Sequence, residues 1–282
     1  MSKLKGKVAV VTGSTSGIGR SCAALFAKEG ARVVITGRRH DVGQDVAASI
    51  GDGAIFVDCD VTHEADIKCL IDTSLLRFGQ IDCLVNNAGA ASNTRSIIAT
   101  DPEALDYDIA LHVRAPFLAM KYAAPAMFVR GSGSIINISS VSATRAGFNT
   151  FGYEVAKAAL VHLTRCAALE FGEKGVRVNA ISPGPTLTGI FGKHSGVDAN
   201  VADRSFSGIE AGFTAMLSTI QPMPGMVHAE DIANAALFLA SDQSHYVNGH
   251  DLIVDGGISA GRPASTMQAG WKALAELVQS TH

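Results

Sequence analysis

Short runs of apolar, mostly β-branched residues recur along the chain and alternate with longer segments of helical periodicity. Apolar runs of this length, bounded by turn residues, are typical of strands buried on both faces of a parallel sheet. The runs predict strands at residues 7–12, 32–36, 54–57, 81–85, 134–140, 176–181 and 251–254. The helical patterns predict helices at residues 20–28, 64–78, 101–128, 151–171 and 229–240, with Pro116 and Pro125 expected to kink or interrupt the third. Strands alternating with helices predict an α/β fold, in one large domain or two smaller ones.

The composition of the 282 residues fits a compact globular protein and argues against several other classes. Apolar residues make up 47% and charged residues 17%, and the net charge of −3 provides no basic surface for nucleic acid. No apolar run approaches the length of a membrane span, and the segment before the first strand lacks the apolar core of a signal peptide. Five scattered cysteines without a C-x-x-C pair favour reduced thiols over disulfides or a zinc site. We therefore expect a cytoplasmic protein that binds no metal, nucleic acid or membrane.

A glycine-rich turn follows the first predicted strand and opens the first predicted helix. It reads Gly13-Ser14-Thr15-Ser16-Gly17-Ile18-Gly19. At a strand-to-helix turn, glycines let the backbone approach a pyrophosphate, whose negative charge is stabilised by the helix N-terminus. The spacing differs from the G-x-G-x-x-G of the commoner dinucleotide fingerprint, and a glycine-rich turn by itself is often only a tight connection. Its position between strand and helix favours a phosphate site formed by Gly13, Ser16, Gly17, Ile18 and Gly19.

The second predicted strand is followed by two arginines, at a point where dinucleotide-binding folds often have an acidic residue. The acid binds the ribose 2′-hydroxyl of NAD, whereas arginine accommodates the 2′-phosphate of NADP. The sequence here is Gly37-Arg38-Arg39. We therefore predict NADP(H) as the cofactor, with Arg38 at the 2′-phosphate. NAD(H) is the alternative cofactor, and a solvated basic loop is the alternative interpretation of the arginines.

Polar and small residues follow three further predicted strands. Because open α/β sheets bind ligands at the carboxyl ends of their strands, these residues are candidates for cofactor contacts. Asp60, with Val61 after it, is expected near the adenine, and Asn87, Ala88 and Gly89 are expected to line the floor of the cofactor site. After the sixth strand, a Pro/Gly turn can place a backbone amide and a hydroxyl against a nicotinamide carboxamide and a phosphate. Its candidate residues are Pro183, Gly184, Thr186 and Thr188.

Tyr153 and Lys157 are spaced one turn apart in a predicted helix, so their side chains share one face. A free tyrosine has a pKa of about 10, too high for efficient acid–base chemistry at neutral pH. A nearby ammonium stabilises the phenolate and typically lowers such a pKa by about 1–3 units. Ser140, at the end of the fifth predicted strand, can hydrogen-bond the oxygen of a carbonyl or alcohol. Tyr-x-x-x-Lys alone is common on amphipathic helices, but together with Ser140 and the predicted cofactor-binding turns it predicts a catalytic set.

Periodicity is weak between residues 189 and 227, where glycine, serine and methionine are frequent. Long irregular segments in compact domains tend to be lids or binding loops. We interpret this segment as a substrate lid, with the apolar candidates Ile190, Phe191, Phe206, Phe213 and Met216. The tail, residues 258–282, contains a short amphipathic stretch around Trp271, Leu274 and Leu277. It is expected to cover either a neighbouring subunit or the active site of its own chain.

Together these motifs resemble the short-chain dehydrogenase/reductase family, over nearly the whole chain to Gly257. The matching pieces are Thr12-Gly13-x-x-x-Gly17-Ile18-Gly19, Asp60-Val61, Asn86-Asn87-Ala88-Gly89, Ser140, Tyr153-x-x-x-Lys157, Pro183-Gly184 and Asp255-Gly256-Gly257. The resemblance implies a single doubly wound Rossmann-type domain over residues 1–282, with a seven-stranded parallel sheet and helices on both faces. It also implies a nicotinamide cofactor, a small-molecule substrate and a homo-oligomer, usually a tetramer and sometimes a dimer.

The resemblance assigns roles to the catalytic set. It implies that Tyr153 exchanges a proton with the substrate oxygen, that Lys157 lowers the pKa of Tyr153 and binds the nicotinamide ribose, and that Ser140 polarises the carbonyl. The chain departs from the family at His112, where an asparagine usually holds a water linked to the lysine. Because histidine titrates near neutrality, our hypothesis is that His112 takes over this proton relay and adds a pH dependence near its own pKa. A packed histidine without a role is the alternative.

The predicted function is that of an oxidoreductase that transfers a hydride between the nicotinamide cofactor and a secondary alcohol or ketone. The small number of charges in the predicted lid favours a neutral, hydrophobic, cyclic or aromatic substrate. An enoyl reductase is less favoured, because the resemblance implies a wider spacing between tyrosine and lysine in that branch of the family than the spacing found here. The alternative from another class is a dinucleotide-binding sensor or assembly subunit without turnover.

Overall fold

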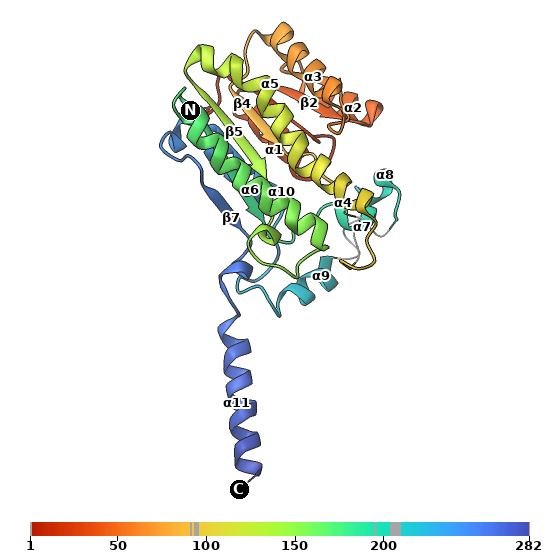
Figure 1. Ribbon diagram of the computed structural model, residues 1–282, viewed down its shortest axis with the longest axis vertical. Coiled ribbons are helices and arrows are strands. Elements are labelled where there is room, and N and C mark those ends of the chain that lie inside the picture. Colours follow the sequence, from red (N-terminus) through yellow and green to blue (C-terminus); the bar gives the residue numbers. More distant parts are fainter. Residues whose placement is uncertain (1, 91, 93–95, 195, 204–209, 282) are drawn as a thin grey trace.

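The computed structural model describes residues 2–90, 92, 96–194, 196–203 and 210–281. It consists of a central sheet with helices packed against it, and of a C-terminal helix that extends away from this body (Figure 1). Within the described residues the sheet has seven strands: β1 (Val8–Val11), β2 (Arg32–Gly37), β3 (Ala54–Asp58), β4 (Cys83–Asn86), β5 (Gly133–Ile138), β6 (Val176–Pro183) and β7 (Asp251–Val254).

The strands are all parallel and are arranged in the order β3-β2-β1-β4-β5-β6-β7. Val10 of β1, which is fully buried, pairs with Val34 of β2 on one side and Leu84 of β4 on the other. The chain winds outward from β1 to β3 and then in the opposite direction from β4 to β7. In open α/β sheets such a reversal leaves a crevice at the carboxyl ends of the central strands, where ligands bind. The order confirms the predicted seven-stranded parallel sheet.

Helices cover both faces of the sheet, which confirms the doubly wound architecture. Successive strand residues point to opposite faces, so Ala9 and Val11 belong to one hydrophobic cluster and Val10 to the other. The first cluster includes residues of α1 (Gly17–Lys28), α2 (His40–Ile50) and α10 (Ala229–Ala240). The second includes residues of α3 (Glu64–Phe78), α5 (Ala115–Arg130) and α6 (Phe151–Gly172). Because both faces of the sheet are buried, the strands need the continuous apolar runs seen in the sequence.

Helix α2 was not among the helices predicted from the sequence. Its segment contains Gly43, a residue that weakens a helical pattern. A Cβ atom at Gly43 would lie 2.0 Å from the Phe56 ring, so the helix packs on β3 at a distance that only glycine permits. Tertiary packing therefore overrides the low helix propensity at this position.

The long helix predicted for residues 101–128 is divided by a π-helical segment. Its parts are α4 (Pro102–Ile109), the π segment η1 (Ala110–Arg114) and α5. Pro116, just after the π segment, lacks the N–H group that an α-helix would donate to the carbonyl oxygen of His112. The interruption expected at Pro116 is therefore confirmed, whereas α5 continues through Pro125.

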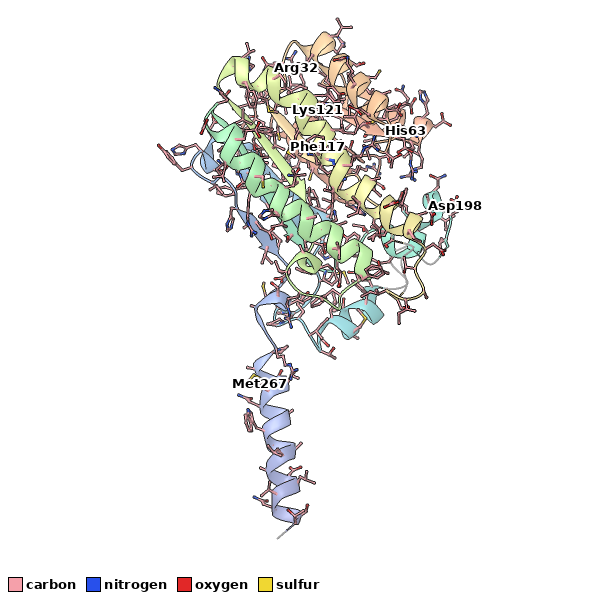
Figure 2. The ribbon with its side chains drawn as sticks, in the orientation of Figure 1. Arg32, His63, Phe117, Lys121, Asp198 and Met267 are labelled. Carbon is pink, nitrogen blue, oxygen red and sulfur yellow. The ribbon has the colours of Figure 1, made fainter. Side chains whose placement is uncertain are left out.

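The predicted lid segment contains three short helices in its described part: α7 (Ile190–His194), α8 (Ala199–Ala202) and α9 (Glu210–Leu217). The rings of Phe191 and Phe213 pack 4.9 Å apart between centroids, while Met216 is exposed and Phe206 lies outside the described residues. Asp198, labelled in Figure 2, caps α8 by accepting hydrogen bonds from the amides of Asn200 and Val201.

The tail forms a longer helix than the predicted short amphipathic stretch. After the turn η4 (Ile258–Ala260), α11 (Ala264–Ser280) extends away from the sheet and its helices, with Met267 exposed on it (Figures 1 and 2). None of the residues of α11 is buried, so this helix does not cover the active site of its own chain. In the described part of the chain, no helix is both long and apolar enough to span a membrane.

Candidate active site

The glycine-rich turn between β1 and α1 is shaped to receive an anion. Gly13 and Gly17 have φ angles of +62° and +53°, a region that favours glycine. Helix α1 begins at Gly17, its N-cap Ser16 makes no capping hydrogen bond through its side chain, and its first turn holds no acidic residue. Neither the N-cap residue nor the first turn of α1 therefore supplies an anionic side chain to the first N–H groups of the helix, as an anion site requires. This geometry fits a phosphate of a dinucleotide.

The tip of β4 holds this turn in place. Asn87 donates from Nδ2 to the carbonyl oxygens of Thr12 and Gly13, at 2.9 and 3.1 Å. The Thr12 hydroxyl oxygen in turn accepts hydrogen bonds from the amides of Asn87 and Ala88, at 2.9 and 3.0 Å. Asn87 thus ties the ends of β1 and β4 together, a role that its predicted place on the cofactor floor did not include.

The turn after β6 lies against the same region. The Gly184 amide donates to the carbonyl of Val254 at 2.9 Å, and a Cβ atom at Gly184 would lie 2.8 Å from the Cα atom of Asp255. The Thr186 hydroxyl donates to the Gly184 carbonyl at 2.9 Å. A Cβ atom at Gly17 would lie 3.4 Å from the Thr188 methyl group, so Thr188 lies beside the glycine-rich turn.

The two arginines that follow β2 make different contacts. The Arg38 side chain is 65% exposed, and its Nη1 atom lies 3.6 Å from Oδ2 of Asp60. Asp60 uses Oδ1 to accept hydrogen bonds from the amide and the hydroxyl of Thr62, at 3.0 and 2.7 Å. Arg39, by contrast, turns toward the glycine-rich turn and donates to Thr15 Oγ1 at 3.2 Å. Sequence reasoning selected Arg38 and left out Arg39, although the doubled arginine was the signal for both.

Ser140, Tyr153 and Lys157 meet where β5 ends and α6 begins. The Ser140 hydroxyl lies close to the Tyr153 hydroxyl and accepts a hydrogen bond from the Ser142 amide at 3.1 Å. Lys157, which is only 4% exposed, donates from Nζ to the carbonyl oxygen of Ile138 at 2.7 Å. Its Nζ atom lies 5.5 Å from the centroid of the Tyr153 ring. The structure therefore brings the three predicted catalytic side chains together.

The ionisation of this set differs from the prediction. Burial raises the pKa of Tyr153 to about 12, and the nearby carboxyl of Asp108 acts in the same direction, while the hydrogen bond with Ser140 opposes them. Burial also lowers the pKa of Lys157 to about 7. The expectation that Lys157 lowers the pKa of Tyr153 is therefore wrong for the protein without a bound ligand, because burial disfavours both charged forms. Tyr153 is consequently protonated at neutral pH.

His112 lies directly against Tyr153. It is 1% exposed, and its ring packs edge-on against the Tyr153 ring, with centroids 5.1 Å apart and an interplanar angle of 81°. The Ala90 backbone is close to the imidazole, but neither ring nitrogen makes a well-aligned hydrogen bond within the described part of the chain. Burial, and then the charge of Lys157, lower the pKa of His112 well below its usual value. A pH dependence from His112 is therefore expected in the acid range, not near neutrality.

Asp108 adds a second buried titratable group that sequence reasoning missed. It lies one helical turn before His112, is 1% exposed, and accepts a hydrogen bond from the Ser92 hydroxyl through Oδ2. Burial raises the pKa of its carboxyl group. The available signal was the spacing of Asp108 and His112, four residues apart on a helix that leads into the active site.

The comparisons with known proteins agree with this fold. A family model described as enoyl-(acyl carrier protein) reductase matches residues 13–259. Momilactone A synthase of Oryza sativa subsp. japonica is 40% identical over 260 residues, which are 91% of each chain. The (+)-borneol dehydrogenase 1 of Salvia officinalis is 36% identical, with 93% of this chain and 96% of the relative aligned. A crystal structure of a protein from Agrobacterium tumefaciens, described only as a candidate gluconate dehydrogenase, superposes with a TM-score of 0.79 and 31% identity, over 92% of this chain and 98% of the other.

These relatives are similar along almost their full length, and the family model covers the glycine-rich turn and the tyrosine–lysine pair alike. The family implies a nicotinamide cofactor, either NAD(H) or NADP(H), and the free N-terminus of α1 fits the phosphate of such a group. From the parallel sheet, the site at its carboxyl edge and these similarities, we conclude that the chain belongs to the short-chain dehydrogenase/reductase family of oxidoreductases.

Proposed function

We propose that this protein is an NADP(H)-dependent oxidoreductase that interconverts a neutral, hydrophobic secondary alcohol and the corresponding ketone. The observation that carries the proposal is the pairing of the Ser140 and Tyr153 hydroxyls, with the amine of Lys157 beside the tyrosine ring. Two hydroxyl groups that lie close together can both reach a single ligand oxygen. A carbonyl or alcohol oxygen is the ligand group that such a pair recognises.

The dinucleotide would be held by residues on both sides of the strand reversal. The glycine-rich turn, including Gly13, Ser16, Gly17, Ile18 and Gly19, would receive its phosphates, and Asp60 with Val61 would contact the adenine. Asn87, Ala88 and Gly89 would border the nicotinamide half, together with Pro183, Gly184, Thr186 and Thr188. When bound, the nicotinamide group supplies or accepts the hydride.

The proton chemistry belongs to the chain itself. In the direction of ketone reduction, the protonated Tyr153 hydroxyl donates its proton to the substrate oxygen while Ser140 donates a hydrogen bond to the same oxygen. The negative charge of the Tyr153 phenolate that remains stabilises the protonated form of Lys157, because an opposite charge nearby raises a lysine pKa. Lys157, whose pKa burial has brought to about 7, then exchanges this proton readily at physiological pH. His112, in contact with the Tyr153 ring, is our candidate for relaying protons to this pair.

The preference for NADP(H) rests on the residues at the end of β2. NAD-binding folds often have an acidic residue at this position, which binds the ribose 2′-hydroxyl, but this chain has Gly37 there. Arg38 and Arg39 follow it. Arg38 is the proposed 2′-phosphate partner, with its exposed side chain free to move from its 3.6 Å approach to Asp60. NAD(H) is the alternative.

The substrate class is supported by the lid segment. The rings of Phe191 and Phe213 pack against each other there, and a relative is named as a borneol dehydrogenase. The Tyr153–Lys157 spacing supports an alcohol or ketone over an enoyl substrate, despite the description of the family model.

We also propose a homo-oligomer located in the cytoplasm. Large apolar side chains are exposed on the neighbouring helices α5 and α6, at Phe117, Val129, Val155 and Leu169 (Figure 2 labels Phe117). The five cysteines are all free thiols. A tetramer is expected, with a dimer as the alternative, and light scattering with size-exclusion chromatography measures which one forms.

The proposed function is tested by nicotinamide absorbance with a panel of cyclic secondary alcohols and ketones. Wild-type protein is expected to turn over at least one of them. Tyr153→Phe is expected to abolish turnover while dinucleotide affinity, measured by calorimetry, stays within about twofold of wild type. Undiminished turnover by Tyr153→Phe would refute the assignment, and binding without any turnover by the wild type would favour a sensor or assembly subunit.

A further inference from the structure

Two cations from separate parts of the chain converge on one carboxylate beside the glycine-rich turn. Arg39 follows β2 and Lys193 lies on α7, and both bind Asp203, the residue after α8. Arg39 Nη2 is 2.8 Å from Asp203 Oδ2, and Lys193 Nζ is 2.8 Å from Asp203 Oδ1. The carboxylate is 16% exposed and the two cationic side chains are 24% and 32% exposed. This burial distinguishes the cluster from ordinary surface ion pairs.

The same two cations also contact the turn. Arg39 donates to Thr15 Oγ1 at 3.2 Å, and Lys193 donates to Ser16 Oγ at 3.3 Å. Ser16 is the N-cap of α1, so both positive charges lie near the positive end of that helix dipole. Cations are normally unfavourable at a helix N-terminus. Two of them gathered there form a site that requires an anion, and in the ligand-free protein the Asp203 carboxylate is that anion.

Asp203 is packed into its place by the backbone of the lid segment. A Cβ atom at Gly189 would lie 2.1 Å from Asp203 Oδ1, so the carboxylate sits directly on this glycine. The neighbouring Thr188 faces Gly17 across the turn. A carboxylate paired with an arginine and a lysine occupies the kind of cationic site that a phosphate can also occupy. It stands beside the turn where the phosphates of a dinucleotide are expected.

We propose that Arg39 and Lys193 form an anion subsite for a phosphate group of the nicotinamide dinucleotide, and that the Asp203 carboxylate fills this subsite in the ligand-free protein. The inference rests on the proposed function for the identity of the ligand, and it adds a lysine of the lid segment to the cofactor site. On binding, phosphate oxygens accept from Arg39 and Lys193 in place of the carboxylate. Asp203 therefore competes with the cofactor and lowers its affinity.

Calorimetric titration of the full chain with NADP⁺ and with NAD⁺, at low ionic strength and without substrate, tests this competition. Asp203→Asn keeps the shape that packs on Gly189 and removes the competing charge, so it is expected to tighten binding about three- to tenfold. Lys193→Met is expected to weaken binding by a similar factor, and Lys193→Arg is expected to restore it. In the Lys193→Met background, the gain from Asp203→Asn is expected to shrink, because the two residues share one interaction.

The matched control is the Lys68–Asp72 ion pair on the outer surface of α3, whose side chains are 56% and 60% exposed. Lys68→Met and Asp72→Asn are expected to leave both affinities unchanged. An effect confined to NADP⁺ assigns the subsite to the 2′-phosphate, and an equal effect on both dinucleotides assigns it to the pyrophosphate.

Unchanged or weaker binding by a folded Asp203→Asn variant, with a wild-type circular dichroism spectrum, would overturn the inference. If that variant fails to fold, wild-type affinity in Lys193→Met overturns it instead. Wild-type protein that binds neither dinucleotide would refute the proposed function, a separate result from the same titrations.

Discussion

Lys157→Met is expected to stabilise the folded protein near neutral pH while it removes catalysis. Burial lowers the pKa of Lys157 from 10.5 to about 7 in the folded chain, whereas an exposed lysine in the unfolded chain keeps its ordinary value. Between pH 7 and 10.5 the unfolded state therefore binds more protons than the folded state, and stability rises with pH. The destabilising effect of the buried lysine is fully developed below the folded pKa and disappears above the unfolded one.

The magnitude follows from this shift. A difference of one pKa unit corresponds to about 1.4 kcal/mol, so the buried lysine costs about 4 kcal/mol at pH 7 and about 2 kcal/mol at pH 9. Methionine has a similar length and no charge, but it leaves the Ile138 carbonyl without the 2.7 Å hydrogen bond from Nζ. An unsatisfied buried carbonyl costs about 1–3 kcal/mol. The variant is therefore expected to be about 1–3 kcal/mol more stable at pH 7.

Urea unfolding of wild type and Lys157→Met at pH 7, 8 and 9 measures this effect. The stability advantage of the variant is expected to fall by about 2 kcal/mol across this range. Burial raises the pKa of Cys22, Cys59 and Cys83 to about 12, but these thiols are present in both proteins and cancel in the difference. Lys68→Met on the exposed surface of α3 serves as the control, and its difference from wild type should not vary with pH. A difference for Lys157→Met that is equally constant would refute the reasoning.

Three further substitutions examine other parts of the site. Gly13→Ala is expected to weaken dinucleotide binding at least about tenfold and to lower stability by about 1–3 kcal/mol, since residue 13 has φ +62° and its Cβ would lie 2.8 Å from Ala88 Cα; calorimetry and urea unfolding at wild-type values would contradict this. His112→Asn is expected to slow turnover and to remove an acid-range decline from the pH–rate profile, where the lowered pKa of His112 places its protonation. Unchanged activity and profile would remove the relay hypothesis. Arg38→Asp is expected to shift the ratio of kcat/KM values from NADP(H) toward NAD(H), and a surviving NADP(H) preference would count against the 2′-phosphate assignment.

The sequence predicts the sheet and the polypeptide turns of the site well because both depend on local chemistry. A strand buried on both faces requires a continuous apolar run, and β1, β2 and β4 satisfy this requirement at Val10, Val34 and Leu84. The glycine-rich turn is recognisable because its φ angles and close contacts require glycine at residues 13 and 17. These features are set by a few neighbouring residues and are visible without a structure.

The direction and the burial of a side chain cannot be predicted from the neighbouring residues in the sequence alone. Arg38 and Arg39 are identical in chemistry, but the strand geometry exposes the first and turns the second toward Thr15. The pKa values of Tyr153 and Lys157 depend on how deeply the surrounding atoms bury them. The spacing of four residues alone therefore predicts a lowered pKa for Tyr153, whereas burial raises it in the protein without a bound ligand. The burial of Asp108 could not be predicted from the sequence for the same reason. It results from packing between α4 and α6.

The π-helical segment at Ala110–Arg114 sets the angular relation between the two helices that it joins. An α-helix advances about 100° per residue, and a π turn closes its hydrogen bond over one more residue, so the side chains beyond it point in a rotated direction. Asp108 and His112 lie before or within this turn, and α5 then packs its own apolar residues against the sheet. Shortening the segment by a single residue would rotate one helix against the other and misalign both buried surfaces. The direction in which α4 presents Asp108, relative to the face that α5 packs on the sheet, therefore depends on the length of this segment.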